Sequence, residues 1–265
     1  MKHPLTIDIS GRVRITSNSG GDCILTAAPD GLSSPASELR YQENALLAGG
    51  SIGGSRAMMR RITLQFVLPG RTWHEASSLF PLGRMERITV KRGGTVRYIH
   101  GYRDGPLVPI EQSANSTPHV QVSFLCGTSY FVRDVLHRHE FMHVESGLEY
   151  PKEYPISYGQ LASNDRVFCT NAGDYPAPFE LDLRSSANGA MSVIVGTQRA
   201  DIVGISVGDS ITLNTDTRML WVNGKKRFDM FRGVFPLIPV GGADVVLDRF
   251  VGTAQIAYSE IFEGV

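Results

Sequence analysis

The sequence has no excess of charge of either sign, and this argues against two broad classes of partner. Its 265 residues include 26 lysines and arginines against 26 aspartates and glutamates, so the formal net charge is zero. An excess of basic side chains is what draws a protein to nucleic acid or to an anionic lipid surface. We therefore expect neither nucleic acid nor a membrane surface as a partner.

Cysteines and long apolar runs are also scarce. Cys23, Cys126 and Cys169 lie far apart and form no CxxC pair, which favours buried thiols in a reducing compartment over disulfides or a cysteine-only zinc site. The first residues, MKHPLTIDISG, lack the apolar stretch of a signal peptide. No window reaches the roughly 18 uncharged apolar residues of a membrane helix. We expect a soluble protein that is made in the cytosol.

Short apolar or alternating runs, separated by turn residues, make up most of the chain. Residues 61–68 and 120–126 alternate apolar with polar side chains, as a strand with one buried face does. Gly93-Gly94 and Asn223-Gly224 each separate two such runs, and both dipeptides suit the positive φ of a two-residue hairpin turn. The pattern predicts an all-β protein.

Residues 72–82 are the exception, because they have the pattern of a helix. Thr72 can cap the first turn, and Glu75 stands three residues later, as in a capping box. Trp73 and Ala76 begin one apolar face. We therefore expect an all-β fold with one short helix.

Two domains are expected. Pro151 and Pro155 fall in a stretch that reads as an extended connector, since proline lacks the donor that a central strand needs. Strand-like runs then follow at the spacing of an antiparallel sandwich. The sequence predicts an N-terminal β domain over residues 1–155 and a C-terminal β-sandwich over residues 156–265.

Within the first domain, residues 33–60 show no sustained period. Gly49 to Gly54 form a glycine-rich run that lacks the lysine and hydroxyl residue of a phosphate-binding loop. A long loop in a compact domain usually has a function or is mobile. We expect residues 40–60 to form an exposed arm, which could wrap a neighbouring subunit.

Residues 139–143 spell HExxH, with His137 just upstream. On a helix, His139 and His143 would face one way and bind zinc, while Glu140 would act as a general base. The surrounding run alternates like a strand, however, and a strand would hold the two histidines about 13 Å apart. We therefore expect no metal site here, and we assign no catalytic, cofactor-binding or metal-binding residue anywhere in the chain.

Trp221, in the alternating run before Asn223-Gly224, is expected to pack in the core of the second domain. The alternative is that it stacks on a sugar ring. Acidic pairs such as Glu180 with Asp182 are expected to lie on a solvated face, and the chain has no G-x-S-x-G elbow for a serine nucleophile.

The order of several short motifs resembles one known family. These motifs are Leu148-Glu149-Tyr150-Pro151, Tyr154-Pro155, Asn171-Ala172-Gly173-Asp174, Ala177-Pro178, Gly208-Asp209-Ser210-Ile211, Asp216-Thr217-Arg218, Asn223-Gly224, Phe235-Pro236-Leu237-Ile238-Pro239 and Ala257-Tyr258. In this order they resemble the C-terminal half of the distal tail protein, or Dit, of siphophages. The N-terminal half is similar more loosely, through Asp30-Gly31-Leu32, the Trp73 helix, Gly93-Gly94, and Phe124-Leu125-Cys126 before Tyr130-Phe131.

This resemblance implies a ring-forming N-terminal β domain, with a β-sandwich or barrel-like build, and a C-terminal galectin-like β-sandwich. It also implies a homo-hexameric ring at the phage tail tip, with the tail tube protein and a tail-associated hub protein as partners and receptor-binding proteins as further partners of the C-terminal domain. The arm at residues 40–60 falls where the family carries a belt that reaches an adjacent subunit, and residues 137–143 fall in the connector between the domains.

The sequence departs from the family at two turns. Cys126-Gly127-Thr128-Ser129-Tyr130 lacks the usual Asp-Pro, and Pro239-Val240-Gly241-Gly242 lacks the usual Asn. The second domain also lacks the His-Asn-Arg and Trp-Gly-x-Glu sets of sugar-binding galectins, so sugar binding does not carry over. The expected function is a structural, non-enzymatic part of a virion, made in the host cytoplasm. The alternatives are a carbohydrate-binding module and, behind it, a zinc peptidase at residues 139–143.

Overall fold

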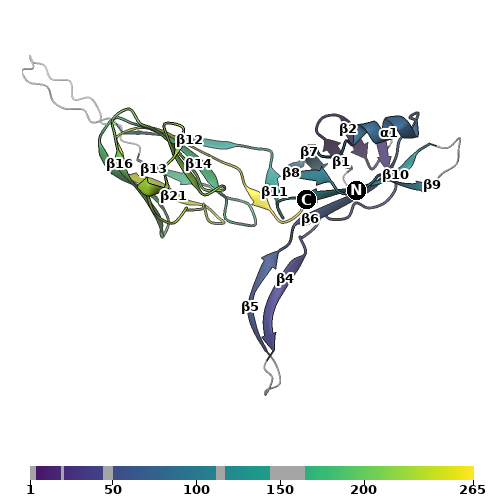
Figure 1. The fold of residues 1–265 in the computed structure, drawn as a ribbon, viewed down its shortest axis with the longest axis horizontal. Coiled ribbons are helices and arrows are strands. Elements are labelled where there is room, and N and C mark those ends of the chain that lie inside the picture. Colours follow the sequence, from purple (N-terminus) through teal and green to yellow (C-terminus); the bar gives the residue numbers. More distant parts are fainter. Residues whose placement is uncertain (1–3, 19–20, 44–49, 112–116, 144–164) are drawn as a thin grey trace, which may run out of the picture. The chain divides into compact units, whose positions relative to one another are not determined.

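A computed structural model describes residues 4–18, 21–43, 50–111, 117–143 and 165–265. The chain divides into two compact units (Figure 1). Unit 1 comprises Met1–Asp134 and Ile261–Val265, and unit 2 comprises Val135–Glu260. Among the described residues, no helix is long and apolar enough to cross a membrane.

Unit 1 is built around a closed barrel of seven strands. The described strands of the whole unit are β1 (Leu5–Ile9), β2 (Val13–Thr16), β3 (Cys23–Leu25), β4 (Ser37–Glu43), β5 (Gly50–Ala57), β6 (Arg60–Val67), β7 (Met85–Arg92), β8 (Thr95–Arg103), β9 (Val108–Glu111), β10 (His119–Cys126), β11 (Phe131–Arg133) and β23 (Ile261–Phe262). The order runs β8-β7-β1-β2-β3-β6-β10, and β10 closes the barrel by pairing with β8 through Phe124 and Arg103. Only β2 and β3 pair in parallel among the described strands of this barrel.

The long strands of the barrel bury every second residue. Along β10, Val120, Val122, Phe124 and Cys126 are all buried, while the residues between them are partly exposed. Because of this alternation, the side chains on one face of the curved sheet fill the interior of the barrel. The all-β prediction with one helix is confirmed.

The helix α1 (Trp73–Leu79) begins as the sequence predicts. The Thr72 side chain accepts a hydrogen bond from the Glu75 amide, and the Glu75 carboxylate accepts one from the Thr72 amide, which completes a capping box. The helix ends at Leu79 rather than at residue 82, because Phe80 precedes a proline and takes a non-helical conformation. Phe80 instead packs its ring 5.6 Å from that of Phe66 in the barrel core.

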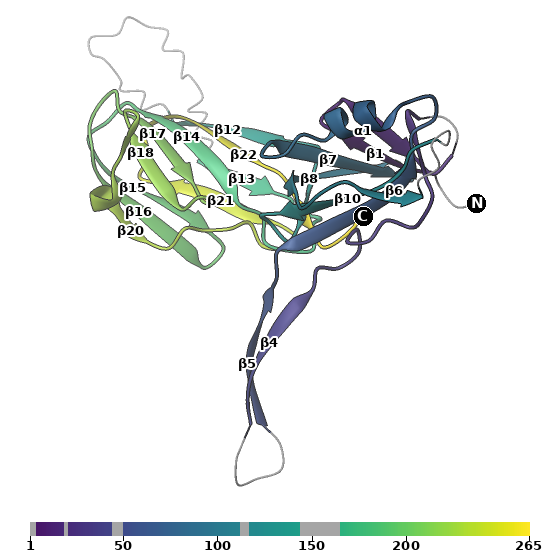
Figure 2. The ribbon, with the colours of Figure 1, turned by 45° about the vertical axis from the view of Figure 1, so that its right-hand side comes forward.

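Unit 2 is a sandwich of two antiparallel sheets (Figure 2). Its elements are β12 (His137–His143), β13 (Arg166–Cys169), β14 (Phe179–Ser185), β15 (Gly189–Val195), β16 (Gln198–Ile205), β17 (Ser210–Asn214), β18 (Met219–Val222), β19 (Lys225–Lys226), the 3₁₀ turn η1 (Phe228–Met230), β20 (Phe231–Gly233), β21 (Ala243–Asp248) and β22 (Gly252–Tyr258). One sheet has the order β12-β22-β14-β17-β18-β19, and the other β13-β21-β15-β16-β20. The buried apolar side chains of the two sheets form one continuous core.

Two of the sequence motifs in unit 2 contain an asparagine that fixes the local structure. Asn171 is 1% exposed, and its side-chain amide donates to the carbonyls of Tyr175 and Ile238 and accepts from the Gly173 amide. At the hairpin, Asn223 (φ 50°) and Gly224 (φ 74°) make the two-residue turn between β18 and β19. Asn171 therefore has a structural role in its motif through hydrogen bonds, and Asn223 has one through its positive φ.

The compact units divide at a place other than the expected domain boundary. The prediction of residues 1–155 and 156–265 placed it at a proline-rich stretch that lies outside the described residues. The compact units instead divide after Asp134, because β12 pairs along its whole length with β22 of the sandwich. The chain then returns to unit 1 at its end, where β23 pairs with β11.

Candidate functional site: arm, groove and histidine strand

The arm expected at residues 40–60 is a two-stranded hairpin rather than an irregular loop. Strands β4 and β5 pair with each other from Ser37↔Ala57 to Glu43↔Gly50, with a bulge after Arg40, and form a sheet with no third strand among the described residues. An isolated two-stranded hairpin is marginally stable in water. A ribbon of this kind therefore gains stability from a surface that covers it.

The register makes the hairpin amphipathic. Leu39 lies opposite Ser55 and shares a face with Ile52, whereas Glu38 lies opposite Arg56 on the other face. The Leu39 and Ile52 side chains are 55% and 72% exposed. Exposed apolar residues that gather on one face of a ribbon mark an interaction surface.

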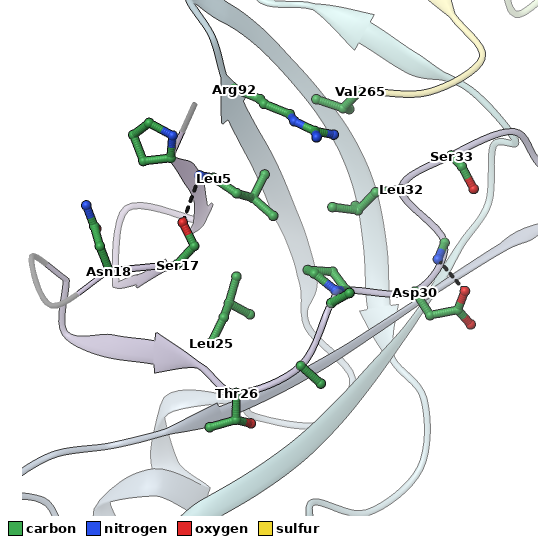
Figure 3. A pocket seen from close by; sticks show the side chains of 15 residues that line it. Leu5, Ser17, Asn18, Leu25, Thr26, Asp30, Leu32, Ser33, Arg92 and Val265 are labelled. Atoms are coloured by element: carbon green, nitrogen blue, oxygen red, sulfur yellow. Dashed lines mark hydrogen bonds between the residues drawn. The ribbon is translucent and has the colours of Figure 1, made fainter. Parts of the chain in front are cut away.

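Unit 1 also carries an open groove of about 820 Å³ (Figure 3). Leu5, Leu25, Leu32 and Val265 supply apolar side chains to its lining, and Ser17, Asn18, Thr26, Asp30, Ser33 and Arg92 supply polar ones. The Ser17 hydroxyl, which accepts a hydrogen bond from the Leu5 amide at 3.0 Å, helps to hold one wall in place. This lining is mixed and singles out no class of ligand.

The HExxH motif lies on strand β12, paired with β22, and not on a helix. The strand places the partly buried His139 on the inner face with buried Phe141, whereas Glu140 is exposed on the opposite face. His137 stacks on Tyr258 with ring centroids 4.9 Å apart. The expected connector is therefore a strand of the sandwich, and Glu140 cannot act on a water held beside His139.

Within the described ranges, no three histidine, cysteine, aspartate or glutamate side chains gather closely enough to hold a metal ion. Trp221 differs from its prediction. Leu220 and Val222 fill the core, while Trp221 is half-buried on the outer face of the six-stranded sheet. Alternation identifies two faces but does not say which of them is the inner one.

All three cysteines are free and buried. Burial raises the pKa of Cys126 to about 11, and the pKa of Cys23 and Cys169 to about 12. Because the raised pKa keeps each thiol protonated well above neutral pH, none is a ready nucleophile.

We predict that a maleimide reagent at mildly alkaline pH labels the native protein very slowly, and that it labels all 3 cysteines once the protein is unfolded in denaturant. Mass spectrometry of the labelled chain counts the adducts. Rapid labelling of one thiol in the native protein would contradict the burial described above.

Two features went unnoticed in the sequence. One is Arg60, 3% exposed, which donates to the backbone carbonyls of Gly31, Ser33, Ser129 and Glu263. The other is the return strand β23, which is only two residues long. A short tail held by backbone contacts leaves no periodic signal, and a buried arginine looks like a surface arginine in sequence.

No protein family model matches the chain, and no curated protein is detectably similar to it in sequence. Solved structures are similar to it in fold. The Dit protein (gp 19.1) of phage SPP1, described as a paradigm of the hub adsorption apparatus in phages that infect Gram-positive bacteria, matches with a TM-score of 0.68 and 11% identity, over 97% of this chain and 99% of that one. A chain of the phage P2 baseplate in its activated conformation matches with a TM-score of 0.50 and 10% identity, over 98% of each chain. Over nearly its whole length this chain has the fold of the Dit hub proteins of phage tails, which is the fold that the motif resemblance predicted.

Proposed function

We propose that this chain is the distal tail protein of a long-tailed phage. Six copies form a ring that joins the tail tube to the tail-tip hub and the host-adsorption apparatus, and the chain carries out no catalysis. The observation that carries the proposal is the whole-chain likeness to the SPP1 Dit protein, with a TM-score of 0.68 over 97% of this chain. The proposed location is the tail tip of the virion, after synthesis in the host cytoplasm.

The amphipathic hairpin β4–β5 supports the assembly part of the proposal. Its exposed Leu39 and Ile52 lie on one face of a ribbon that has no third strand among the described residues. A head-to-tail contact repeated around a closed ring places the same arm on each neighbouring copy. Burying two such side chains contributes roughly 3–6 kcal/mol per contact before the cost of ordering the arm.

Native mass spectrometry and size-exclusion chromatography of the purified chain test the ring. We expect hexamers in the wild type and monomers or small fragments of the ring in the double variant Leu39→Glu, Ile52→Glu. The matched control is the double variant Val207→Glu, Val240→Glu, which places the same two charges at 62% and 55% exposed apolar positions in unit 2. A wild-type chain that stays monomeric at every concentration would count against the ring, and an intact ring in the double variant would remove the arm from the contact.

A further inference from the structure

A continuous row of polar and aromatic residues crosses the outer face of the six-stranded sheet in unit 2. The strand registers align Glu140, Gln255, Asp182, Thr212, Trp221 and Lys226 in one line, on β12, β22, β14, β17, β18 and β19. Buried neighbours such as Leu183 and Leu220 lie on the opposite, inner face. The row is therefore a surface feature and not part of the core.

This face is hollowed at one end of the row. A depression of about 390 Å³ lies there, and its polar lining residues are Glu140, Asp182, Arg184, Ser210, Thr253 and Gln255. Its volume falls within the range of small-molecule sites, roughly 300–1,000 Å³. Trp221 lies two strands from Asp182 along the row, about 10 Å at the usual strand spacing.

Hydrogen bonds within the face hold its acceptors in place. The Thr212 hydroxyl donates to Asp182 Oδ1 at 2.6 Å, and the Asn214 side-chain amide donates to Glu180 Oε2 at 2.7 Å. Each carboxylate is thus oriented by a neighbouring strand. Acceptors fixed before a ligand arrives lose little side-chain entropy when it binds.

The charges of this face discriminate among ligands. Three carboxylates and three basic side chains lie on it: Glu140, Glu180 and Asp182, and Arg138, Arg184 and Lys226. Because the two signs balance, no net field favours a phosphate-rich polymer or a cation. A protein partner would call for an apolar centre with few charges, whereas the centre of this row is Asp182 and Thr212.

From this arrangement we propose that the outer face of the six-stranded sheet binds a neutral, hydroxyl-rich saccharide. Carboxylate, amide and hydroxyl groups in the depression pair with sugar hydroxyls, and Trp221 packs against an apolar sugar face. The polar residues of this face are not the His-Asn-Arg and Trp-Gly-x-Glu sets of sugar-binding galectins. They are brought together by the pairing of six strands, from β12 to β19. The proposed saccharide site is also independent of the proposed ring.

Isothermal titration of the full-length protein with a panel of neutral oligosaccharides, chosen by a glycan array, tests the proposal. We expect Trp221→Ala and Asp182→Asn each to weaken binding by about tenfold or more, the size of effect expected when one aromatic contact or one charged hydrogen bond is lost. Binding should change little with salt, since the ligand carries no charge. Asp182→Asn keeps the side-chain shape, so it carries the test if the tryptophan variant is unstable.

Matched controls lie on the other sheet. Phe168→Ala removes a 55% exposed aromatic ring from β13, and Asp244→Asn neutralises a partly exposed aspartate of β21 that pairs with Arg166. Both controls should bind as the wild type does. The proposal is overturned if no neutral oligosaccharide binds, if Trp221→Ala and Asp182→Asn bind as well as the controls, or if only charged glycans bind and salt abolishes their binding.

Discussion

Replacing Arg60 by methionine is expected to lower the free energy of unfolding of unit 1 by about 3–5 kcal/mol, because it removes at once the charged donors of four backbone carbonyl groups. The guanidinium donates to the carbonyls of Gly31, Ser33, Ser129 and Glu263. It also lies over the Phe131 ring, 4.8 Å from the centroid. Methionine keeps much of the side-chain volume and removes every donor.

The expected loss is large because Arg60 joins segments that are far apart in sequence. The Ser33 carbonyl precedes the arm, the Ser129 carbonyl lies between β10 and β11, and the Glu263 carbonyl follows the return strand β23. A second arginine, Arg97, donates to the Gly264 carbonyl and stacks over Phe262. The two arginines therefore fix the end of the chain against the barrel of unit 1.

The chain has 2 tryptophans, Trp73 in unit 1 and Trp221 in unit 2, so each unit can be followed by its own fluorescence. In a Trp221→Phe background, denaturant unfolding reports on unit 1 through Trp73. The matched control is Arg61→Met at the next position, where a mostly exposed arginine pairs with Asp104 and the expected loss is below about 1 kcal/mol. Equal effects of the two substitutions would show that the buried donor set of Arg60 is not what stabilises this end of unit 1.

The parts of this fold that the sequence predicts are local ones. The Thr72–Glu75 capping box, the Gly93-Gly94 turn and the Asn223-Gly224 turn each involve residues a few positions apart, so their chemistry is visible in a short window. The strands that pair across these turns are also where the alternation predicts them. Local turn chemistry and alternation together were enough for the all-β class.

What the sequence could not supply depends on contacts between distant residues. Three such features join segments that carry no local signal. They are the β8–β10 pairing that closes the barrel, the β12–β22 pairing that places β12 in unit 2, and the pairing of the return strand β23 with β11. The face of the sheet on which Trp221 lies also depends on contacts between distant residues, since Leu220 and Val222 suit a core equally well. The surface that we infer to bind saccharide became visible only when the registers aligned six strands.

Replacing Gly252 by alanine is the other change with a large expected effect on stability, because the backbone around Gly252 leaves no room for a Cβ. Gly252 opens β22, which pairs with both β12 and β14, and it has φ +143°. A Cβ at this position would lie 2.1 Å from the Arg184 carbonyl oxygen of the neighbouring strand. Since that oxygen belongs to the backbone of the sandwich, it cannot move aside without disturbing the pairing. We expect Gly252→Ala to lower the free energy of unfolding of unit 2 by about 3 kcal/mol or more.

Gly189 allows the steric part of this effect to be separated from the backbone part. It has nearly the same φ, +141°, and a Cβ there would meet nothing within 4 Å. Gly189→Ala therefore carries only the backbone strain, about 1–3 kcal/mol. In a Trp73→Phe background, where Trp221 reports on unit 2, the difference between the two alanine variants measures the cost of the clash. Were Gly252→Ala no more destabilising than Gly189→Ala, the close approach of β22 and β14 at Arg184 would not constrain the sandwich.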